Sequence, residues 1–276
     1  MRKTTSTKNL VRVTVKDGIG TLTMNDPESR NSMSLAMMEA LKVACEGINS
    51  RSDIRVLIVT GAGDAFSAGG NMHDMTEREG LFASEDPMWA RDMNLSHVHK
   101  IPNAIHGVRV PTIAAVNGHA IGGGCDIAVM CDIRIASTEA VFAESFLRVG
   151  LVPGDGGAWF LPRAIGLSRA MEMALTCDFI DAATAERIGL VSRVVPHDKL
   201  LAEANAIAAR IARHPTEIAC MTKSLLRFGA QSSLPDTLEM TAAMQGIVQT
   251  SEPHRAAARK IAATMKKATK AVKKAA

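Results

Sequence analysis

The chain opens with alternating hydrophobic and polar residues. Every second residue from Val11 to Val15 is valine, Asp17-Gly18 follows, and a second apolar run extends to Met24. Alternation with a period of two is typical of a half-buried strand, and Asp-Gly favours a tight hairpin turn. We therefore predict a β-hairpin over residues 11–24.

A helical period follows the hairpin. From Leu35 the apolar positions recur every three or four residues, through Leu41 and Cys45 to Ile48. This spacing places them on one face of a helix, and Ser34 is suited to cap its N-terminus.

Continuous apolar runs then alternate with glycine-rich turns and further helical patterns. The runs cover residues 54–60, 112–116, 133–136 and 141–143. Such runs are typical of strands buried on both faces, and their alternation with helices favours an α/β fold with mostly parallel strands. After Asp181 the pattern is helical almost throughout.

These patterns suggest three parts: a core of strands and helices over residues 10–200, a helical region over 201–261, and a Lys/Ala-rich tail over 262–276 that we expect to be disordered. Within the core, residues 77–96 are polar and lack a period. We expect a mobile loop with helical fragments there.

Composition narrows the class of protein. Of 276 residues, 47% are hydrophobic and 22% are charged, which is typical of a globular chain. We find no uncharged apolar stretch long enough to cross a bilayer and no secretory signal, so no membrane partner is expected. The five cysteines are an odd number without C-x-x-C spacing, which argues against a disulfide framework or a zinc site and favours the reducing cytoplasm.

The positive net charge resides at the C-terminus. Residues 259–276 hold seven cations and no acids, so the rest of the chain carries −3 of the +4 total. Aromatic residues make up 3% of the chain and tyrosine is absent, so there is little material for base stacking. Nucleic acid is therefore not expected as a partner.

Two glycine-rich turns, residues 65–72 and 117–126, each follow a predicted buried strand. Backbone amides that converge from two such turns can form an oxyanion hole, and ligands of open α/β sheets bind at this end of the strands. Either set of glycines could instead serve a tight turn or close helix packing. Neither turn is a G-x-G-x-x-G fingerprint, and the chain contains no P-loop.

Taken together, these motifs resemble the crotonase (enoyl-CoA hydratase/isomerase) superfamily. The resemblance covers about residues 10–260 and is carried by A-F-S-A-G-G-N-M at 65–72, N-G-H-A-I-G-G-G-C-D at 117–126, R-N-S-M-S at 30–34, G-L-V-P-G-D-G-G at 150–157, and the segment 182–191. It implies an α/β spiral of ββα turns with a helical C-terminal trimerisation region. It also implies trimers or dimers of trimers that bind acyl-CoA thioesters.

By match of position, the amides of Ala68 and Gly123 would hold the thioester oxygen as it becomes an enolate. Each such donor is worth about 3 kcal/mol in other oxyanion holes. The chemistry then needs no metal and no cofactor beyond the coenzyme A of the substrate. The resemblance also implies a CoA-binding surface made of Arg30, Ser32, Met33, Ala68, Gly70, Asn71 and Met72.

The acid/base groups depart from the hydratase pattern. Hydratases carry one glutamate just after the triple glycine, where this chain has Asp126, as the dienoyl-CoA isomerase branch also does. They carry a second glutamate four residues before Gly150, where this chain has Phe146. A phenylalanine cannot hold the hydratase water.

Glu144 and Asp155 lie near that position and could replace the missing carboxylate. Each of the three acids also has a structural alternative. Asp126 would interact favourably with the positive end of a helix, and Asp155 would cap a helix that begins at Gly156. Glu144 would form a salt bridge with Arg148 or Arg163.

The resemblance therefore implies an enzyme that hydrates 2-trans-enoyl-CoA to 3-hydroxyacyl-CoA. Double-bond isomerisation of an enoyl- or dienoyl-CoA is the alternative, because it needs a proton shuttle but no positioned water. A lower-ranked alternative is a non-catalytic scaffold that binds nucleic acid through the basic tail.

Overall fold

The computed structural model describes residues 10–275, with side chains through residue 265. The chain divides into two compact units, one up to Ala212 and one from Arg213. The boundary therefore lies twelve residues beyond the one predicted at residue 200, because the helix over Leu200–Ala212 packs against the sheet of the first unit.

A six-stranded sheet forms the centre of the first unit. Its order is β1-β2-β3-β5-β7-β10, with β1 at Val11–Lys16, β2 at Ile19–Met24, β3 at Val56–Gly61, β5 at Thr112–Val116, β7 at Ile133–Ser137 and β10 at Val194–Val195. β1 and β2 pair antiparallel, with Lys16 opposite Ile19, which confirms the hairpin. The other pairs are parallel, as the continuous apolar runs predicted.

A second sheet consists of short strands, of which sequence analysis predicted the run at residues 141–143 and left the others within turns. Its order is β4-β6-β8-β9, with β4 at Ala65–Ser67, β6 at His119–Ile121, β8 at Val141–Ala143 and β9 at Ile180–Asp181. β4, β6 and β8 follow β3, β5 and β7 along the chain and pair in the same order. Each long strand thus leads into a short one, which confirms the predicted spiral of strand pairs and helices.

The helices of the first unit occupy the segments between these strand pairs and after them. They are α1 (Leu35–Asn49), α2 (Met72–Thr76), α3 (Pro87–Met93), α4 (Lys100–His106), α5 (Gly123–Met130), α6 (Gly157–Ile165), α7 (Leu167–Thr176), α8 (Ala182–Arg187) and α9 (Leu200–Ala212). The Ser34 side chain accepts a hydrogen bond from Met37 N, which confirms the predicted cap of α1. Residues 77–96 contain α3, a short turn at Gly80–Phe82 and the start of another at Asn94–Val98, so the expected helical fragments are present.

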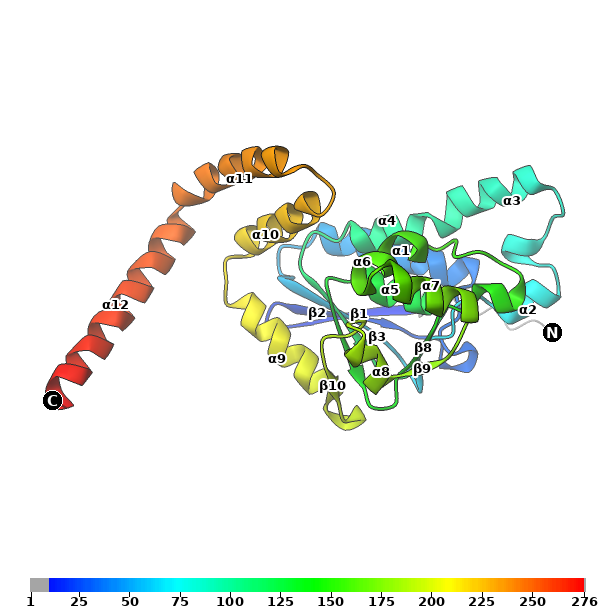
Figure 1. Cartoon of the computed structure of the whole chain (residues 1–276), viewed down its shortest axis with the longest axis horizontal. Helices are drawn as coiled ribbons and strands as arrows, with labels where there is room; N and C mark the ends of the chain where they lie inside the picture. Colours follow the sequence, from blue (N-terminus) through cyan, green and yellow to red (C-terminus); the bar gives the residue numbers. More distant parts are fainter. Residues whose placement is uncertain (1–9, 276) are drawn as a thin grey trace. The chain divides into compact units, whose positions relative to one another are not determined.

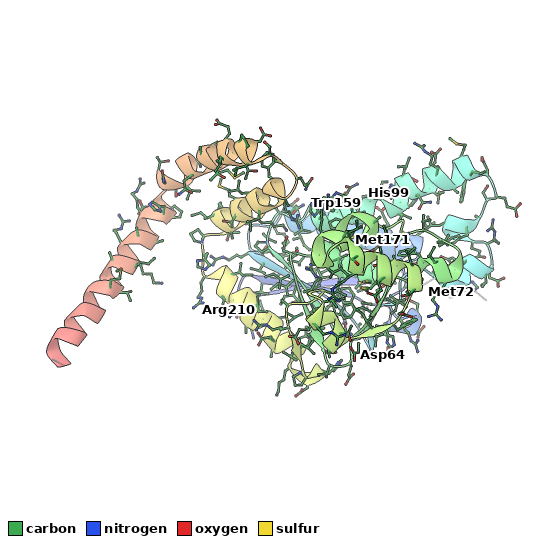
Figure 2. All side chains as sticks on the ribbon, in the orientation of Figure 1. Asp64, Met72, His99, Trp159, Met171 and Arg210 are labelled. Carbon is green, nitrogen blue, oxygen red and sulfur yellow. The ribbon has the colours of Figure 1, made fainter. Side chains whose placement is uncertain are left out.

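Helices cover both faces of the six-stranded sheet. The apolar side of α9, with Leu200, Ala204 and Ile207, packs on Ile58 and Ile113 of the central strands. α1, α4 and α5 lie on the other side (Figure 1). Side chains fill the space between the layers (Figure 2), and this packing fixes the ends of the strands where the glycine-rich turns begin.

The second unit is made of helices, as predicted. They are α10 (Thr216–Gly229), α11 (Leu234–Gln249) and α12 (Glu252–Ala275). α12 includes most of the Lys/Ala-rich segment that was expected to be disordered, because alanine and lysine are both strong helix formers. Several large apolar side chains of this unit are exposed, namely Leu226, Leu234, Leu238, Ile247, Ile261 and Met265.

All five cysteines are buried, and none of them forms a disulfide. Across residues 10–275, no helix has both the length and the apolar character that a membrane span requires. Among the same residues no cluster of side chains is suited to hold a metal ion.

Candidate active site

A cavity of about 400 Å³ lies where the turns after β4, β6 and β8 meet. Its lining comes from five segments: Met33–Met38, Ala68–Met75, Ile121–Gly123, Ser145–Asp155, and residues 81–98 between α2 and α4. Apolar side chains dominate, including Met33, Met38, Met72, Met75, Phe82 and Val98. The structure therefore brings together both glycine-rich turns and part of the polar segment over residues 77–96.

A buried asparagine fixes the first turn. The Asn31 side chain donates hydrogen bonds to the carbonyls of Ala65 (2.9 Å) and Phe66 (3.2 Å), and its backbone carbonyl accepts one from Ser67 Oγ at 2.8 Å. Arg30 and Asn31 both adopt left-handed conformations, with φ of 54° and 57°. These bonds hold residues 65–69 in a single path over the end of β3.

The prediction for Ala68 is wrong. Its amide donates a hydrogen bond to the Arg30 carbonyl at 2.9 Å, so it has no free N–H for a substrate oxygen. The left-handed turn at residues 30–31 carries that carbonyl to the end of β4, which sequence spacing could not reveal. Gly70, two residues further on, also lines the cavity, and no carbonyl among the described residues accepts its amide.

The second turn contacts the first through glycines. A Cβ on Gly69 would lie 2.2 Å from the Ile121 carbonyl oxygen and 3.2 Å from the Gly123 nitrogen, so no side chain fits between the turns. Gly69 also has a φ of +76°, a conformation that favours glycine. Gly123 begins α5, and the first amides of a helix have no acceptor within it. The Gly123 amide and the positive end of α5 therefore face the region of Gly69 and Gly70.

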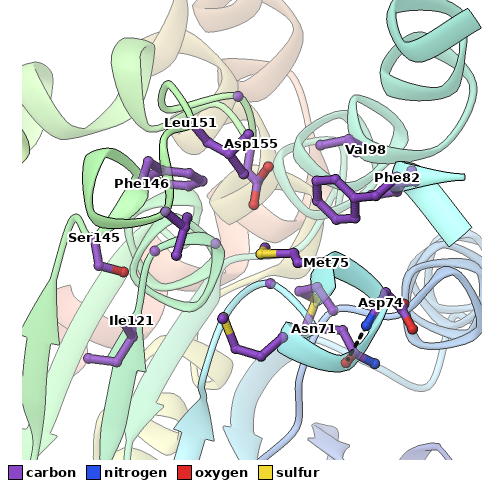
Figure 3. Close-up of a pocket in the computed structure, with 18 of the residues that line it drawn as sticks. Asn71, Asp74, Met75, Phe82, Val98, Ile121, Ser145, Phe146, Leu151 and Asp155 are labelled. Carbon is purple, nitrogen blue, oxygen red and sulfur yellow. Dashed lines mark hydrogen bonds between the residues drawn. The ribbon is translucent and has the colours of Figure 1, made fainter. Parts of the chain in front are cut away.

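Asp155 places a carboxyl next to this amide. A Cβ on Gly123 would lie 2.2 Å from Asp155 Oδ2, so the carboxyl rests against the start of α5. Figure 3 shows it on the cavity wall, with its oxygens pointing toward Met75. Burial raises the pKa of Asp155 to about 6, against an opposing effect of His99. The proposed helix-cap alternative does not hold, because the residue that caps α6 is Gly156 and no side chain caps this end.

Asp126 and Glu144 lie behind the cavity wall instead of on it. Asp126, in the first turn of α5, is 0% exposed, and Glu144, just after β8, is 1% exposed. Neither is among the residues that line the cavity. The proposed ion pair of Glu144 is also absent from the described residues: Arg148 lies over the Phe179 ring and Arg163 over the Trp159 ring.

Comparisons with known proteins agree with this architecture. The family model described as enoyl-CoA hydratase/isomerase matches residues 14–269. The chain belongs to the enoyl-CoA hydratase/isomerase family. It is 39% identical over 223 residues to "Probable enoyl-CoA hydratase echA8" of Mycobacterium bovis, covering 80% of this chain and 82% of that protein. It is 32% identical over 233 residues to "Crotonyl-CoA hydratase" of Syntrophomonas wolfei, covering 84% and 86%.

Solved structures of the family have the same fold. The enoyl-CoA hydratase from Bacillus anthracis superimposes with a TM-score of 0.80 at 32% identity, covering 88% of this chain and 92% of that one. The enoyl-CoA hydratase of Mycobacterium smegmatis gives a TM-score of 0.84 at 27% identity, covering 94% and 97%. The resemblance inferred from the five sequence motifs is thereby confirmed.

This member of the family departs from its hydratases at Phe146. The ring lines the cavity beside Leu151 and is 9% exposed (Figure 3). By the resemblance, a hydratase would carry its second glutamate here. The carboxyl that rests against Gly123 is that of Asp155. Asp74 is a second acid of the lining, and burial raises the pKa of its carboxyl.

The residues expected to contact CoA divide into two groups. Met33, Ala68, Gly70, Asn71 and Met72 line the cavity. The Asn71 side chain is occupied at the start of α2, where it accepts hydrogen bonds from the His73 and Asp74 amides. Arg30 is exposed and Ser32 is buried, and neither lines the cavity.

Sequence reasoning missed several lining residues. Asp74, Phe82 and Asn94 lie in the cavity wall, but they come from segments without a recognisable period. The only signal that pointed to them was the position of this polar stretch between two predicted core elements. Met33 and Met38 line the cavity from the start of α1, where helical spacing marked Met38 as a core position.

Proposed function

We propose that this protein hydrates 2-trans-enoyl-CoA to 3-hydroxyacyl-CoA, with the thioester oxygen held by the amides of Gly70 and Gly123. The observation that carries the proposal is the position of Asp155, whose carboxyl rests against Gly123 inside an apolar cavity. An enolate oxygen at the start of α5 would receive preorganised hydrogen bonds, each worth about 3 kcal/mol. Family membership supports an acyl-CoA thioester as the substrate.

In this proposal the Asp155 carboxyl first accepts a proton and then donates it. The ionised Asp155 accepts a proton from the water whose oxygen adds to C3 of the substrate. The resulting enolate is then protonated at C2 by the same carboxyl, which returns to its ionised form. A pKa of about 6 suits this cycle, because the group is ionised at neutral pH and still close enough to accept a proton.

Phe146 favours isomerisation as the second candidate. In that reaction Asp155 removes a proton from C2 of a 3-enoyl-CoA and returns it to C4, so no water needs a fixed position. The apolar wall formed by Phe146 and Leu151 supports this alternative, since it offers no second acceptor for a hydratase water.

A pair of assays distinguishes the two reactions. With crotonyl-CoA and longer 2-enoyl-CoAs, we expect loss of the conjugated enoyl-thioester absorbance as water adds. Conversion of 3-enoyl-CoA or a dienoyl-CoA, without any absorbance loss from 2-enoyl-CoAs, would establish isomerisation and contradict hydration. Failure of every enoyl-CoA would contradict both.

The same proposal extends to binding and assembly. Met33, Gly70, Asn71 and Met72 would contact the pantetheine and acyl parts of the substrate, with Arg30 and Ser32 further out, and Arg30 or a lysine near the CoA 3′-phosphate. Self-association into trimers or dimers of trimers would cover the exposed apolar side chains of α10 and α11. Five cysteines without a disulfide support a reducing compartment such as the cytoplasm.

A further inference from the structure

Two carboxyls lie deep in the first unit, where the polar groups within reach of them are each other, the Cys125 thiol and the Gly157 amide. All four side-chain oxygens of Asp126 and Glu144 are buried, and none has a partner of acceptable geometry among the described residues. A buried polar group without a partner destabilises a fold, and an ionised one destabilises it far more. Burial of this kind needs a reason beyond packing.

The two carboxyls are neighbours, and they extend inward from Asp155. Asp126 lies one helical turn after Gly123, the residue against which Asp155 rests, and a Cβ on Gly157 would lie 2.0 Å from Asp126 Oδ1. The negative charges of Glu144 and Asp155 both raise the pKa of Asp126, and the charge of Asp155 also raises the pKa of Glu144. Three acids thus form a row from the cavity wall into the core, with the backbone of Gly123 and Gly157 between them.

No cation balances the inner two acids. The Cys125 thiol lies beside Glu144, and the other acid near this pair is Asp155, on the cavity side. The positive charge of Arg134, on β7, opposes the raised pKa of Cys125. The Arg134 side chain donates its hydrogen bonds to the carbonyls of Leu190 and Cys131. His99, at the start of α4, lowers the pKa of Asp155 and so opposes the effect of burial. Among the described residues, no lysine or arginine is one of the groups that shift the pKa of Asp126 or Glu144.

We infer that Asp126 and Glu144 are positioning residues that must remain protonated behind Asp155, and that their ionisation sets the alkaline limit of the reaction. This inference rests on the proposed function. While the pair is neutral, Asp155 is the single negative charge beside the oxyanion site. When the pair loses a proton, a second buried charge appears next to it and opposes both the ionised Asp155 and the developing enolate.

The direction of the pKa shifts agrees with this geometry. Burial raises the pKa of Glu144 to about 7, and burial together with Glu144 raises the pKa of Asp126 well above its usual range. Burial raises the pKa of Asp155 only to about 6, below that of Glu144. A pH window therefore exists in which the outer acid is ionised and the inner pair is not.

The first experiment measures kcat/KM against pH for wild type, Glu144→Gln and Asp126→Asn. Both variants replace an acid by a neutral group of the same shape. We expect a bell-shaped profile for wild type and a shift of the alkaline limb upward by at least about one unit in the variants, which is tenfold in the ionisation equilibrium. The acid limb, which belongs to Asp155, should not move.

A matched control is Glu172→Gln, because Glu172 is exposed on α7. It should leave both limbs in place. An alkaline limb that is unchanged in both inner variants would overturn the inference, even if their maximal rates fall. A role confined to packing would lower the rate at every pH without moving a limb.

Two further measurements do not depend on turnover. In wild type at pH 6, infrared spectroscopy should show a protonated carboxyl band that is lost as the pH rises through the alkaline limb and reduced in each variant. In the folded state Glu144 keeps its proton up to a pH of about 7, whereas the unfolded chain releases it above pH 4.5. The stability of wild type should therefore fall as the pH rises from 4.5 to about 7. Glu144→Gln should lack this part of the decline.

The infrared and turnover measurements distinguish the inference about Asp126 and Glu144 from the proposed function. If no enoyl-CoA is turned over but the infrared band titrates as described, the proposed function fails and the protonated pair stands. If turnover is present but the band is absent at pH 6 in wild type, the inference is overturned and the proposed function stands.

Discussion

Asp155 illustrates how one residue acquires its chemistry from its neighbours. It lies in a glycine-rich loop, and its carboxyl rests against Gly123 because Gly123 has no side chain to fill that space. The apolar wall of Phe146 and Leu151 removes water from around it, which raises its pKa to about 6. An acid that is ionised at neutral pH but easily protonated is suited to move a proton to and from carbon.

Replacing this carboxyl tests its role. In Asp155→Asn the shape is kept but the proton acceptor is removed, so we expect kcat to fall by about 10²–10⁴, the usual contribution of general acid/base catalysis. KM should change little, because the amides of Gly70 and Gly123 still bind the thioester.

Steady-state kinetics on the preferred enoyl-CoA would measure this loss. The control is Asp178→Asn, since Asp178 is exposed in the loop between α7 and β9. An Asp155→Asn enzyme with wild-type kcat would exclude Asp155 and return attention to Asp126 and Glu144.

At the scale of elements, the site depends on a repeated connection. A long strand, a short strand and a glycine-rich turn follow one another three times, so the turns after β4, β6 and β8 meet at one end of the small sheet. Asn31 links the segment before α1 to the first of these turns, with side-chain bonds to the carbonyls of Ala62, Ala65 and Phe66 and from the amide of Asp26. The position of Gly70 therefore depends on a residue outside the cavity.

Asn31→Ala should destabilise the fold by about 2–3 kcal/mol, because buried carbonyls lose their donor and alanine disfavours the left-handed conformation at φ 57°. Urea unfolding monitored by circular dichroism would measure the change. Asn205→Ala, on an exposed position of α9, removes one bond to the Leu201 carbonyl and should have a much smaller effect. Equal destabilisation by the two variants would contradict the linking role of Asn31.

At the scale of the whole molecule, charge and catalysis are assigned to different parts of the chain. The cavity, both glycine-rich turns and all three buried acids belong to the unit that ends at Ala212. The basic residues that give the chain its net charge of +4 cluster after residue 258. Those cations are therefore separate in sequence from every group proposed to act on the thioester.

Deleting residues 262–276 should leave enoyl-CoA turnover unchanged, since the described cavity lining lies between Met33 and Asp155. Light scattering on the shortened protein should still give a multiple of its own chain mass if α10 and α11 provide the contacts between copies. Lost turnover with the fold and assembly preserved would contradict a dispensable tail. Salt-sensitive binding of nucleic acid that disappears on deletion, in an enzyme without turnover, would support the scaffold alternative.

Much of this molecule could be predicted from local patterns. The period of two over residues 11–24, the helical period from Leu35, and the buried runs at 54–60 and 112–116 all correspond to observed elements, because burial on one or both faces dictates which side chains an element carries. The extent of α12 was missed, because a Lys/Ala-rich composition signals low complexity and high helix propensity at once.

By itself, the sequence determined the fold class, the two glycine-rich turns and the acids available for chemistry, since these follow from residue types and their spacing. Tertiary structure decided which amide is free and which acid reaches the cavity. The Ala68 N–H is occupied by the Arg30 carbonyl, and Asp126 lies behind the wall that Asp155 forms. Direction and accessibility depend on contacts between residues far apart in the chain, and no local pattern records them.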